Sequence, residues 1–250
     1  MKKTMKHTVA LAAILVMGFG YNVNAMHIFE GYLEPKWCIM WGVIAIPFFV
    51  IGCMRIKEIL NGDRKNMVLM AMCGAFIFIL SALKIPSVVG SCSHPTGVGL
   101  SAVIFGPFVT AVLGTIVLIF QAVLLAHGGL TTLGANSCSM AIAGPILSYV
   151  IYKICTKCRV SSRISIFLAA VVGDIFTYCV TSFQLGLAFP VNGSVAAATV
   201  NYLGIFAVTQ VPIAIAEGIL TVLIFDFLIK YSKDQLKELH VAGIVKEKIK

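Results

Sequence analysis

Long apolar stretches separated by short basic runs constrain this chain more than any other feature of its sequence. A bilayer-spanning helix needs about 20 mostly apolar residues. Five stretches qualify, at 37–54, 67–84, 136–154, 164–189 and 201–229. Charged residues make up 12% of the chain and hydrophobic residues 59%, whereas a soluble domain has about 25% charged residues. The pattern predicts an all-α, polytopic protein embedded in a lipid bilayer, and it excludes a disordered chain.

A sixth apolar region, 97–126, is too long for one simple span and contains Phe105-Gly106-Pro107. Proline removes a helix hydrogen bond and clashes with the preceding turn. We therefore expect a short helix at 97–106 and a full span at 107–126. A re-entrant hairpin would satisfy the same topology. Counting the short helix, the sequence predicts about seven transmembrane helices.

The basic residues predict the orientation. Downstream of residue 25, 14 of the 16 lysines and arginines fall into two interhelical loops and a tail. They are Arg55, Lys57, Arg64, Lys65, Lys153, Lys157, Arg159, Arg163, Lys230, Lys233, Lys237, Lys246, Lys248 and Lys250. Cytoplasmic loops collect such residues, so the C-terminus should be cytoplasmic and residue 26 outside, in a bacterial or archaeal plasma membrane. A nucleic-acid partner is excluded, because it would require the charge on one folded face.

The first 25 residues have the features of a cleavable signal peptide. Three lysines precede an apolar core at 9–20, and Val23-Asn24-Ala25 fits the small-residue cleavage rule. An uncleaved first transmembrane helix is the alternative. The predicted division is a signal peptide at 1–25, a membrane-embedded domain at 26–230 and a basic cytoplasmic tail at 231–250.

Three histidines fall at the exterior ends of the predicted spans. His27 is the second residue of the mature chain, His94 lies between the second and third spans, and His127 follows the fourth. A lone histidine at a helix end is more often an interfacial hydrogen-bonding residue. Three of them on one side of the membrane indicate a transition-metal site.

The predicted mature terminus is itself a chelate. The Met26 α-amine, the deprotonated His27 amide and the His27 ring provide three nearly coplanar nitrogens, and His94 would complete a square-planar set. Such tetragonal nitrogen sites suit Ni(II) or Cu(II), while Co(II) is weaker in the affinity series. Cys92 is a rival soft ligand, with a disulfide to Cys138 or a small buried thiol as its other interpretations.

Three acidic residues interrupt the apolar stretches. Asp174 and Glu217 lie deepest and would either anchor neighbouring helices through hydrogen bonds or relay ions. Asp226 is near enough to the cytoplasmic end to meet water or Lys230. The sequence contains no P-loop, so any ATPase driving transport would be another chain.

Three motifs give the chain its resemblance to a known family. They are Met26-His27-Ile28-Phe29-Glu30-Gly31-Tyr32-Leu33, Ser91-Cys92-Ser93-His94-Pro95-Thr96-Gly97 and His127-Gly128-Gly129-Leu130-Thr131-Thr132-Leu133-Gly134-Ala135-Asn136. Over 26–230 the chain resembles the CbiM/NikM family, the substrate-specific (S) components of energy-coupling factor transporters for cobalt and nickel. Phe29 and Tyr32 stand where Met and Phe are common in that family.

The resemblance implies a six-helix S-component fold with one extra N-terminal helix. It implies Met26, His27 and His94 as metal ligands, and a place beside the ion or in gating for His127, Ser93, Cys92 and Asn136. The implied partners are a CbiQ-like transmembrane coupling subunit, two CbiO-like cytoplasmic ATPases and a small CbiN-like membrane protein.

We therefore expect a transport subunit that is not itself an enzyme, has no cofactor, and captures Co²⁺ outside the cell. A nickel importer subunit is the first alternative. A stand-alone permease, with Asp174 and Glu217 relaying protons, is the second. A membrane metalloenzyme is a third, but the sequence offers no positioned general base.

Overall fold

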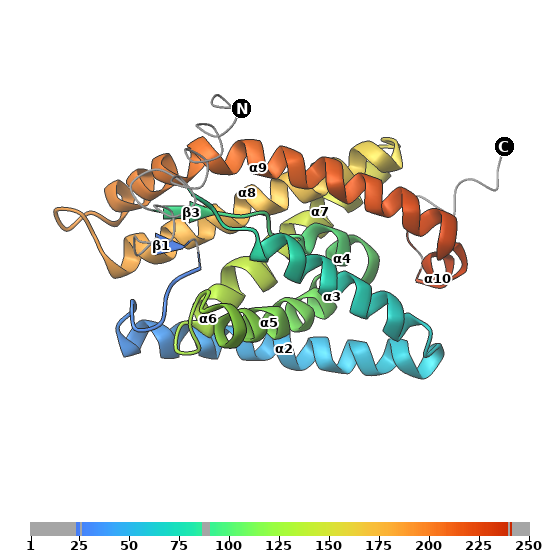
Figure 1. Cartoon of the computed structure of the whole chain (residues 1–250), viewed down its shortest axis with the longest axis horizontal. Helices are drawn as coiled ribbons and strands as arrows, with labels where there is room; N and C mark the ends of the chain where they lie inside the picture. The colour runs from blue at the N-terminus through green and yellow to red at the C-terminus, as the bar shows by residue number, and fades with distance from the viewer. Residues whose placement is uncertain (1–23, 26, 87–90, 240, 242–250) are drawn as a thin grey trace, which may run out of the picture.

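The chain folds into a helical bundle with a very small sheet at one end (Figure 1). The structure, a computed structural model, describes residues 24–25, 27–86, 91–239 and 241. The longer helices are α2 (Pro35–Gly62), α3 (Asn66–Ala82), α4 (Val98–Phe105), α5 (Pro107–Leu125), α7 (Gly144–Lys157), α8 (Ser162–Ala188) and α9 (Val195–Tyr231). Two short elements, α6 (Leu133–Asn136) and the π-helix η2 (Ser137–Ala143), run directly into α7, and α10 (Lys233–Glu238) follows α9.

The predicted membrane fold is confirmed. Five helices are long and apolar enough to cross a bilayer: Pro35–Gly62, Pro107–Leu125, Leu133–Lys157, Ser162–Ala188 and Val195–Tyr231. The shorter apolar helix α3 and the eight-residue α4 complete the bundle. Figure 1 shows α2 along one side of the molecule and the α8–α9 pair along the other, with α3, α4 and α5 between them.

The predicted break at Gly106 is also confirmed. Gly106 has φ +84°, a conformation that L side chains rarely adopt, and Pro107 is the first residue of α5. With about 1.5 Å of rise per residue, the eight residues of α4 extend only about 12 Å. Because α4 cannot cross the roughly 30 Å hydrocarbon core alone, its burial matters. Residues 98–104 are all buried by the surrounding helices.

Several helix ends differ from those expected. Arg55 and Lys57, expected in a loop, lie in the last turns of α2, and Lys153 lies in α7. Lysine and arginine side chains are long enough to reach water from within a helix, so the helices can continue beyond the end of the apolar stretch. The last span begins at Val195 rather than 201, because the Ser194 hydroxyl accepts a hydrogen bond from the Ala197 amide at 3.2 Å and caps the helix.

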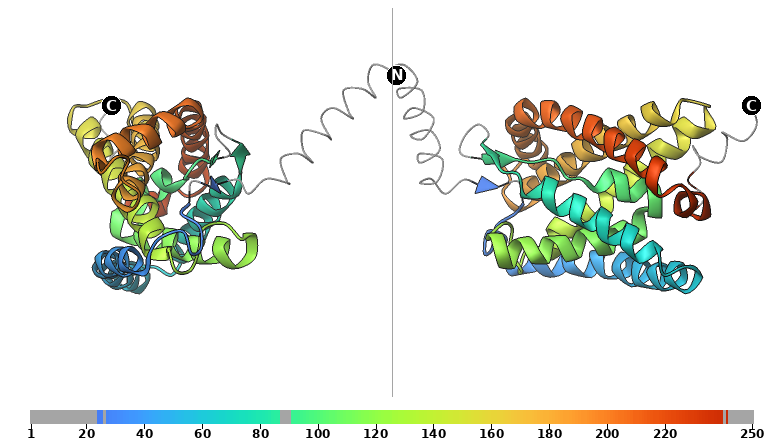
Figure 2. Two further views of the ribbon diagram at one scale, coloured as in Figure 1. Left: turned by 90° about the vertical axis from the view of Figure 1, so that its left-hand side faces the viewer. Right: turned by 45° about the vertical axis from the view of Figure 1, so that its right-hand side comes forward.

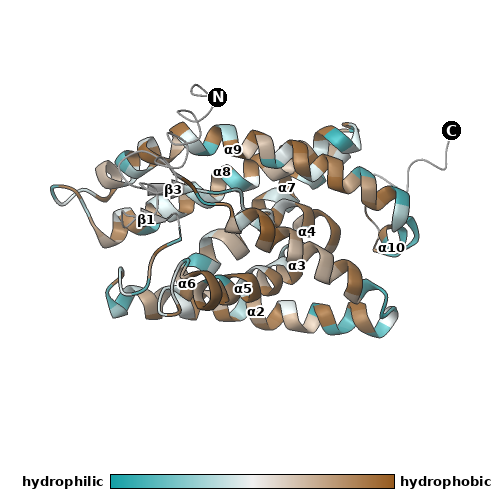
Figure 3. Cartoon of the chain, in the orientation of Figure 1, coloured by the Kyte–Doolittle hydropathy of each residue, from teal (hydrophilic) through white to brown (hydrophobic). Residues whose placement is uncertain are grey.

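The outer surface of the bundle is apolar, as Figure 3 shows in brown along α2, α5 and α9. Large hydrophobic side chains such as Ile39, Val43 and Met54 on α2 are exposed. Close backbone contacts hold α2 onto the bundle. A Cβ placed on Gly134 would lie 2.5 Å from the Cα of Gly42, so these two glycines let the start of α6 touch α2. The exposed apolar surface is the one that lipid would cover.

The sheet was not predicted. β1 (Asn24–Ala25) pairs in parallel with β3 (Ser91–Ser93), which pairs antiparallel with β2 (Ile85–Pro86). Strands this short carry too little sequence pattern to be recognised. Figure 2 (left) looks at this end of the molecule, where β1 and β3 lie beside each other. The pairing places Asn24 beside Ser91 and Ala25 beside Cys92, two residues before His94.

Figure 1 shows α10 and the connection between α2 and α3 at the opposite end of the bundle, and both segments are rich in basic residues in the sequence. Asp226, expected to meet water or Lys230, is partly exposed there and pairs with Arg163 at 3.0 Å. In α10, Leu236 is buried against the bundle, so this start of the basic tail packs onto the protein. Residues 1–23 of the predicted signal peptide and 242–250 of the tail lie outside the described residues.

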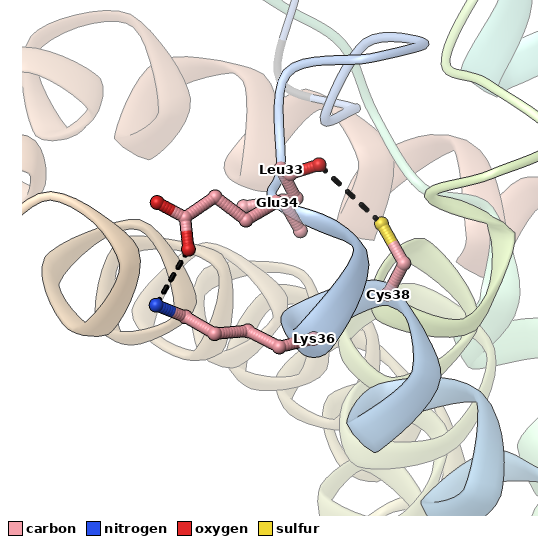
Figure 4. A network of polar contacts seen from close by, with 4 residues as sticks. All are labelled: Leu33, Glu34, Lys36 and Cys38. Atoms are coloured by element: carbon pink, nitrogen blue, oxygen red, sulfur yellow. Dashed lines mark hydrogen bonds and ion pairs between the residues drawn. The ribbon is translucent and has the colours of Figure 1, made fainter.

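The connection from the sheet into α2 is fixed by local contacts, shown in Figure 4. The Cys38 thiol donates to the Leu33 carbonyl at 3.7 Å, and Lys36 pairs with Glu34. Pro35 begins the helix, where its missing N–H costs nothing. These contacts define the turn that leads from the segment around His27 to the first span.

Candidate metal centre

Three buried imidazole rings meet beside the small sheet. Nε2 of His127 lies 2.8 Å from Nδ1 of His27, and Nε2 of His94 lies 3.1 Å from the same Nδ1. The exposed fractions of the three side chains are 2% for His27 and 0% for His94 and His127. The three predicted histidines, separated by up to 100 residues, therefore form one cluster that could hold a metal ion.

Two of the rings have their outer nitrogens engaged, and this orients their lone pairs. Nδ1 of His94 lies 3.0 Å from the Pro95 carbonyl oxygen, which only accepts, so the proton belongs on Nδ1. Nε2 of His27 lies 3.2 Å from the sulfur of Met140, a weak acceptor. Both contacts leave the lone pair of the inner nitrogen, His94 Nε2 or His27 Nδ1, facing the centre of the cluster.

Burial also keeps the rings uncharged. Desolvation, aided by the other histidines, holds the pKa of His27 well below its usual 6.5. Burial lowers the pKa of His94 to about 4 and that of His127 to about 2. At neutral pH the rings are therefore in the form that binds metal.

The main chain around His94 is held by side chains from α8 and α9. The Tyr178 hydroxyl accepts from the His94 amide at 3.1 Å and donates to the His94 carbonyl at 2.8 Å. Nε2 of Gln210 donates to the same carbonyl at 3.3 Å and also to the carboxylate of Asp174. The position of the His94 ring therefore depends on α8 and α9.

Glu217 fixes the residues that follow His94. Its carboxylate accepts from the amide of Thr96 at 2.5 Å and from the amide of Gly97 at 2.9 Å, and the Thr96 hydroxyl donates to it as well. Gly97 has φ +70°, and a Cβ there would lie 3.0 Å from the Cα of Ile77. Glu217 thus holds the residues that lead into α4 through hydrogen bonds.

The segment after His27 is held by the loop that contains His127. Asn136 accepts from the Ile28 amide at 2.8 Å and donates to the Ile28 carbonyl at 3.0 Å, and the Thr132 hydroxyl donates to the same carbonyl at 2.6 Å. A Cβ on Gly129 would lie 2.5 Å from both N and Cα of Glu30. The glycine pair at 128–129 therefore permits the two segments to touch.

The other predicted site residues lie in different surroundings. The Ser93 hydroxyl lies 2.7 Å from the hydroxyl of Thr209, and Cys92 pairs through its backbone with Ala25. Cys138 is a free thiol that donates to the Trp41 carbonyl at 3.3 Å. Met26 and the side chain of Cys92 lie outside the described residues.

Sequence reasoning missed Met140, Tyr178 and Gln210. Each occurs within an apolar stretch, where nothing in the sequence separates it from a packing residue. Met140 lies in the π-helix η2, a rare distortion that often marks functional sites. Polar residues in the middle of the predicted spans were a usable signal for Gln210.

Comparisons with known proteins identify the family of the chain. Residues 27–235 match the family model described as the cobalt uptake substrate-specific transmembrane region, CbiM. The chain is 58% identical to the cobalt transport protein CbiM of Lachnoclostridium phytofermentans, over 96% of this chain and 97% of the relative. It is 56% identical to CbiM of Clostridioides difficile, over 98% of each chain.

Solved structures show the same fold. The crystal structure of a truncated transition metal transporter superimposes with a TM-score of 0.72 at 26% identity, covering 82% of this chain and 99% of that chain. A second transition metal transporter gives the same TM-score at 27% identity, covering 83% of this chain and 94% of that one. The chain therefore belongs to the CbiM family of substrate-specific transmembrane proteins for cobalt uptake.

Proposed function

We propose that this membrane protein is the metal-capturing subunit of an ATP-driven energy-coupling factor importer for Co²⁺. The observation that carries the proposal is the convergence of buried, neutral imidazole nitrogens around His27, directly after the predicted cleavage site. Relatives named as cobalt transport proteins support Co²⁺ over Ni²⁺ as the transported ion.

The proposed ligand set is the Met26 amine, the His27 amide and ring, and the His94 ring. Two nitrogens that bind one ion at about 2.0–2.1 Å and at a right angle lie about 2.8–3.0 Å apart. The 3.1 Å between His27 Nδ1 and His94 Nε2 is close to that value. The geometry therefore supports these two ring nitrogens as neighbours in a square-planar set.

The mature terminus would lie outside the cell, and ATP hydrolysis by partners would drive release of the ion inside. The proposed partners are a CbiQ-like coupling subunit, two CbiO-like ATPases and a CbiN-like accessory protein. Glu217 accepts hydrogen bonds from backbone amides, and Asp174 accepts one from the side chain of Gln210. Their engagement favours an anchoring role over the proton relay that a stand-alone permease would need.

Metal analysis of the purified mature protein tests the proposal. We expect Co²⁺ to copurify with the protein that begins at Met26. A variant with one residue inserted before Met26, and a protein that retains residues 1–25, should lose it, because the amine is then displaced or becomes an amide. Retention of the ion by the insertion variant, with helical content unchanged, would disprove the terminal chelate.

A further inference from the structure

His127, the third histidine of the cluster, is not one of the four ligands of the proposed square-planar set. His127 contributes its Nε2 2.8 Å from Nδ1 of His27, and its side chain is fully buried. That distance equals the separation of about 2.8–3.0 Å expected for two nitrogens at a right angle around one ion. His127 thus approaches as closely as the proposed ligand His94 does.

The ring planes distinguish the place of His127 from that of His94. The amide and ring of His27 belong to one chelate, so the His27 ring lies near the coordination plane. The plane of the His94 ring is inclined only 17° to that of the His27 ring, with the two rings stacked and their centroids 4.6 Å apart. The His127 ring is inclined 78° to His27 and 81° to His94, with centroids at 4.5 and 5.0 Å.

These values match a right-angled arrangement of three rings. With about 1.1 Å from a ligating nitrogen to its ring centre, rings at right angles around one ion have centroids about 4.4 Å apart. Two rings with nearly parallel planes and a third perpendicular to both fit two equatorial ligands and one axial ligand. We propose that His127 is an axial fifth ligand that selects Co²⁺ over Ni²⁺, an inference that rests on the proposed function.

The electronic structures of the two ions give the selectivity. In a strong square-planar field, low-spin Co²⁺ has one electron in the orbital along the axis and gains from a fifth donor. Square-planar Ni²⁺ has that orbital filled and gains little. Four nitrogens alone would favour Ni²⁺, since affinity rises from Co²⁺ to Ni²⁺. An axial imidazole would raise the affinity for Co²⁺ more than that for Ni²⁺ and so offset this order of affinities.

The outer nitrogen of His127 differs from those of the other two rings. Nδ1 of His127 is buried without a hydrogen-bond partner in the described part of the chain, whereas His94 and His27 contact Pro95 and Met140. The proton of His127 is thus not held on Nδ1. A proton on Nε2, donated to Nδ1 of His27, fits the empty site. Under the proposal, metal binding shifts this proton to Nδ1 and frees Nε2.

The experiment compares mature wild-type protein with His127→Ala and His127→Gln, loaded anaerobically with Co²⁺ or Ni²⁺. Gln is chosen because its amide can replace the hydrogen bond to His27 but is a poor metal ligand. We expect both variants to lose Co²⁺ affinity by about tenfold or more, and Ni²⁺ affinity by less than about threefold. The electron paramagnetic resonance spectrum of the Co²⁺ protein should show three-line splitting from one axial nitrogen, absent in both variants.

Equal losses for the two ions, wild-type Co²⁺ affinity in His127→Gln, or persistence of the axial splitting would each overturn the inference while leaving the proposed function intact. Failure of the wild-type protein to bind either ion would overturn the proposed function and this inference with it.

Discussion

Asn136 provides the sharpest test of how the N-terminal segment is held in the bundle. Its buried amide pairs with the Ile28 main chain in both directions, at 2.8 and 3.0 Å. The substitution Asn136→Ala removes both hydrogen bonds one residue away from His27. A buried hydrogen bond contributes about 0.5–1.5 kcal/mol net, so the two together hold the segment by about 1–3 kcal/mol.

In the proposed site, losing these hydrogen bonds weakens metal binding, because His27 can bind the ion only when its segment is held in place. A tenfold change in affinity corresponds to about 1.4 kcal/mol. We therefore expect the Kd for Co²⁺ to rise about 5- to 150-fold in Asn136→Ala, measured by competition with a chromophoric chelator on mature protein. Asn136→Asp should not restore binding, because a carboxylate oxygen would then face the Ile28 carbonyl.

The matched control is Thr181→Val in α8. It removes a buried hydrogen bond from Thr181 to the Thr177 carbonyl, 3.0 Å long, that does not involve the segment around His27. Its Kd should stay within about twofold of wild type, as for substitutions that touch no binding group. If Asn136→Ala also stays within that range, the segment is held by something other than this amide, and the reasoning is wrong.

Three further predictions concern single side chains around the site. Glu217→Gln leaves fewer acceptor oxygens for the backbone amides that the carboxylate now binds. The unfolding temperature in detergent should fall, because one unsatisfied buried amide costs about 1–3 kcal/mol. An unchanged unfolding temperature would contradict the anchoring role of Glu217. Gly129→Ala places a Cβ 2.5 Å from the backbone of Glu30, so metal binding should be lost while circular dichroism shows the helices intact, and normal binding would show that this contact is not needed. Met140→Leu keeps the side-chain volume but removes the sulfur beside the His27 ring. Co²⁺ affinity should fall about tenfold, the lower end of the effect seen when a residue that hydrogen-bonds a metal ligand is replaced. Unchanged affinity would mean that Met140 does not orient the ring.

Much of the membrane fold could be predicted because bilayers impose simple rules on sequence. The apolar stretches had to reach a fixed length, and proline at 107 had to end the preceding helix. The eight-residue α4 and the span that follows it lie where this reasoning put them. Helix ends were less accurate, because capping by Ser194 and the reach of lysine and arginine side chains depend on local geometry.

The site was predictable only in part. Three of the five histidines stood out because they all fell at one predicted face of the membrane domain. The contacts that orient them were not visible. Tyr178 and Gln210 lie more than 80 residues from His94 in the sequence, and no local pattern connects residues so far apart.

The sequence alone thus determined which segments cross the membrane, because hydrophobic length and proline act locally along the chain. The tertiary structure decided which residues meet. It brought His27, His94 and His127 within hydrogen-bond distance and placed one ring perpendicular to the other two. That geometry depends on how α8, α9 and the segment 127–136, which includes α6, pack around the N-terminal segment. Packing between distant segments leaves no periodic signal in a single sequence.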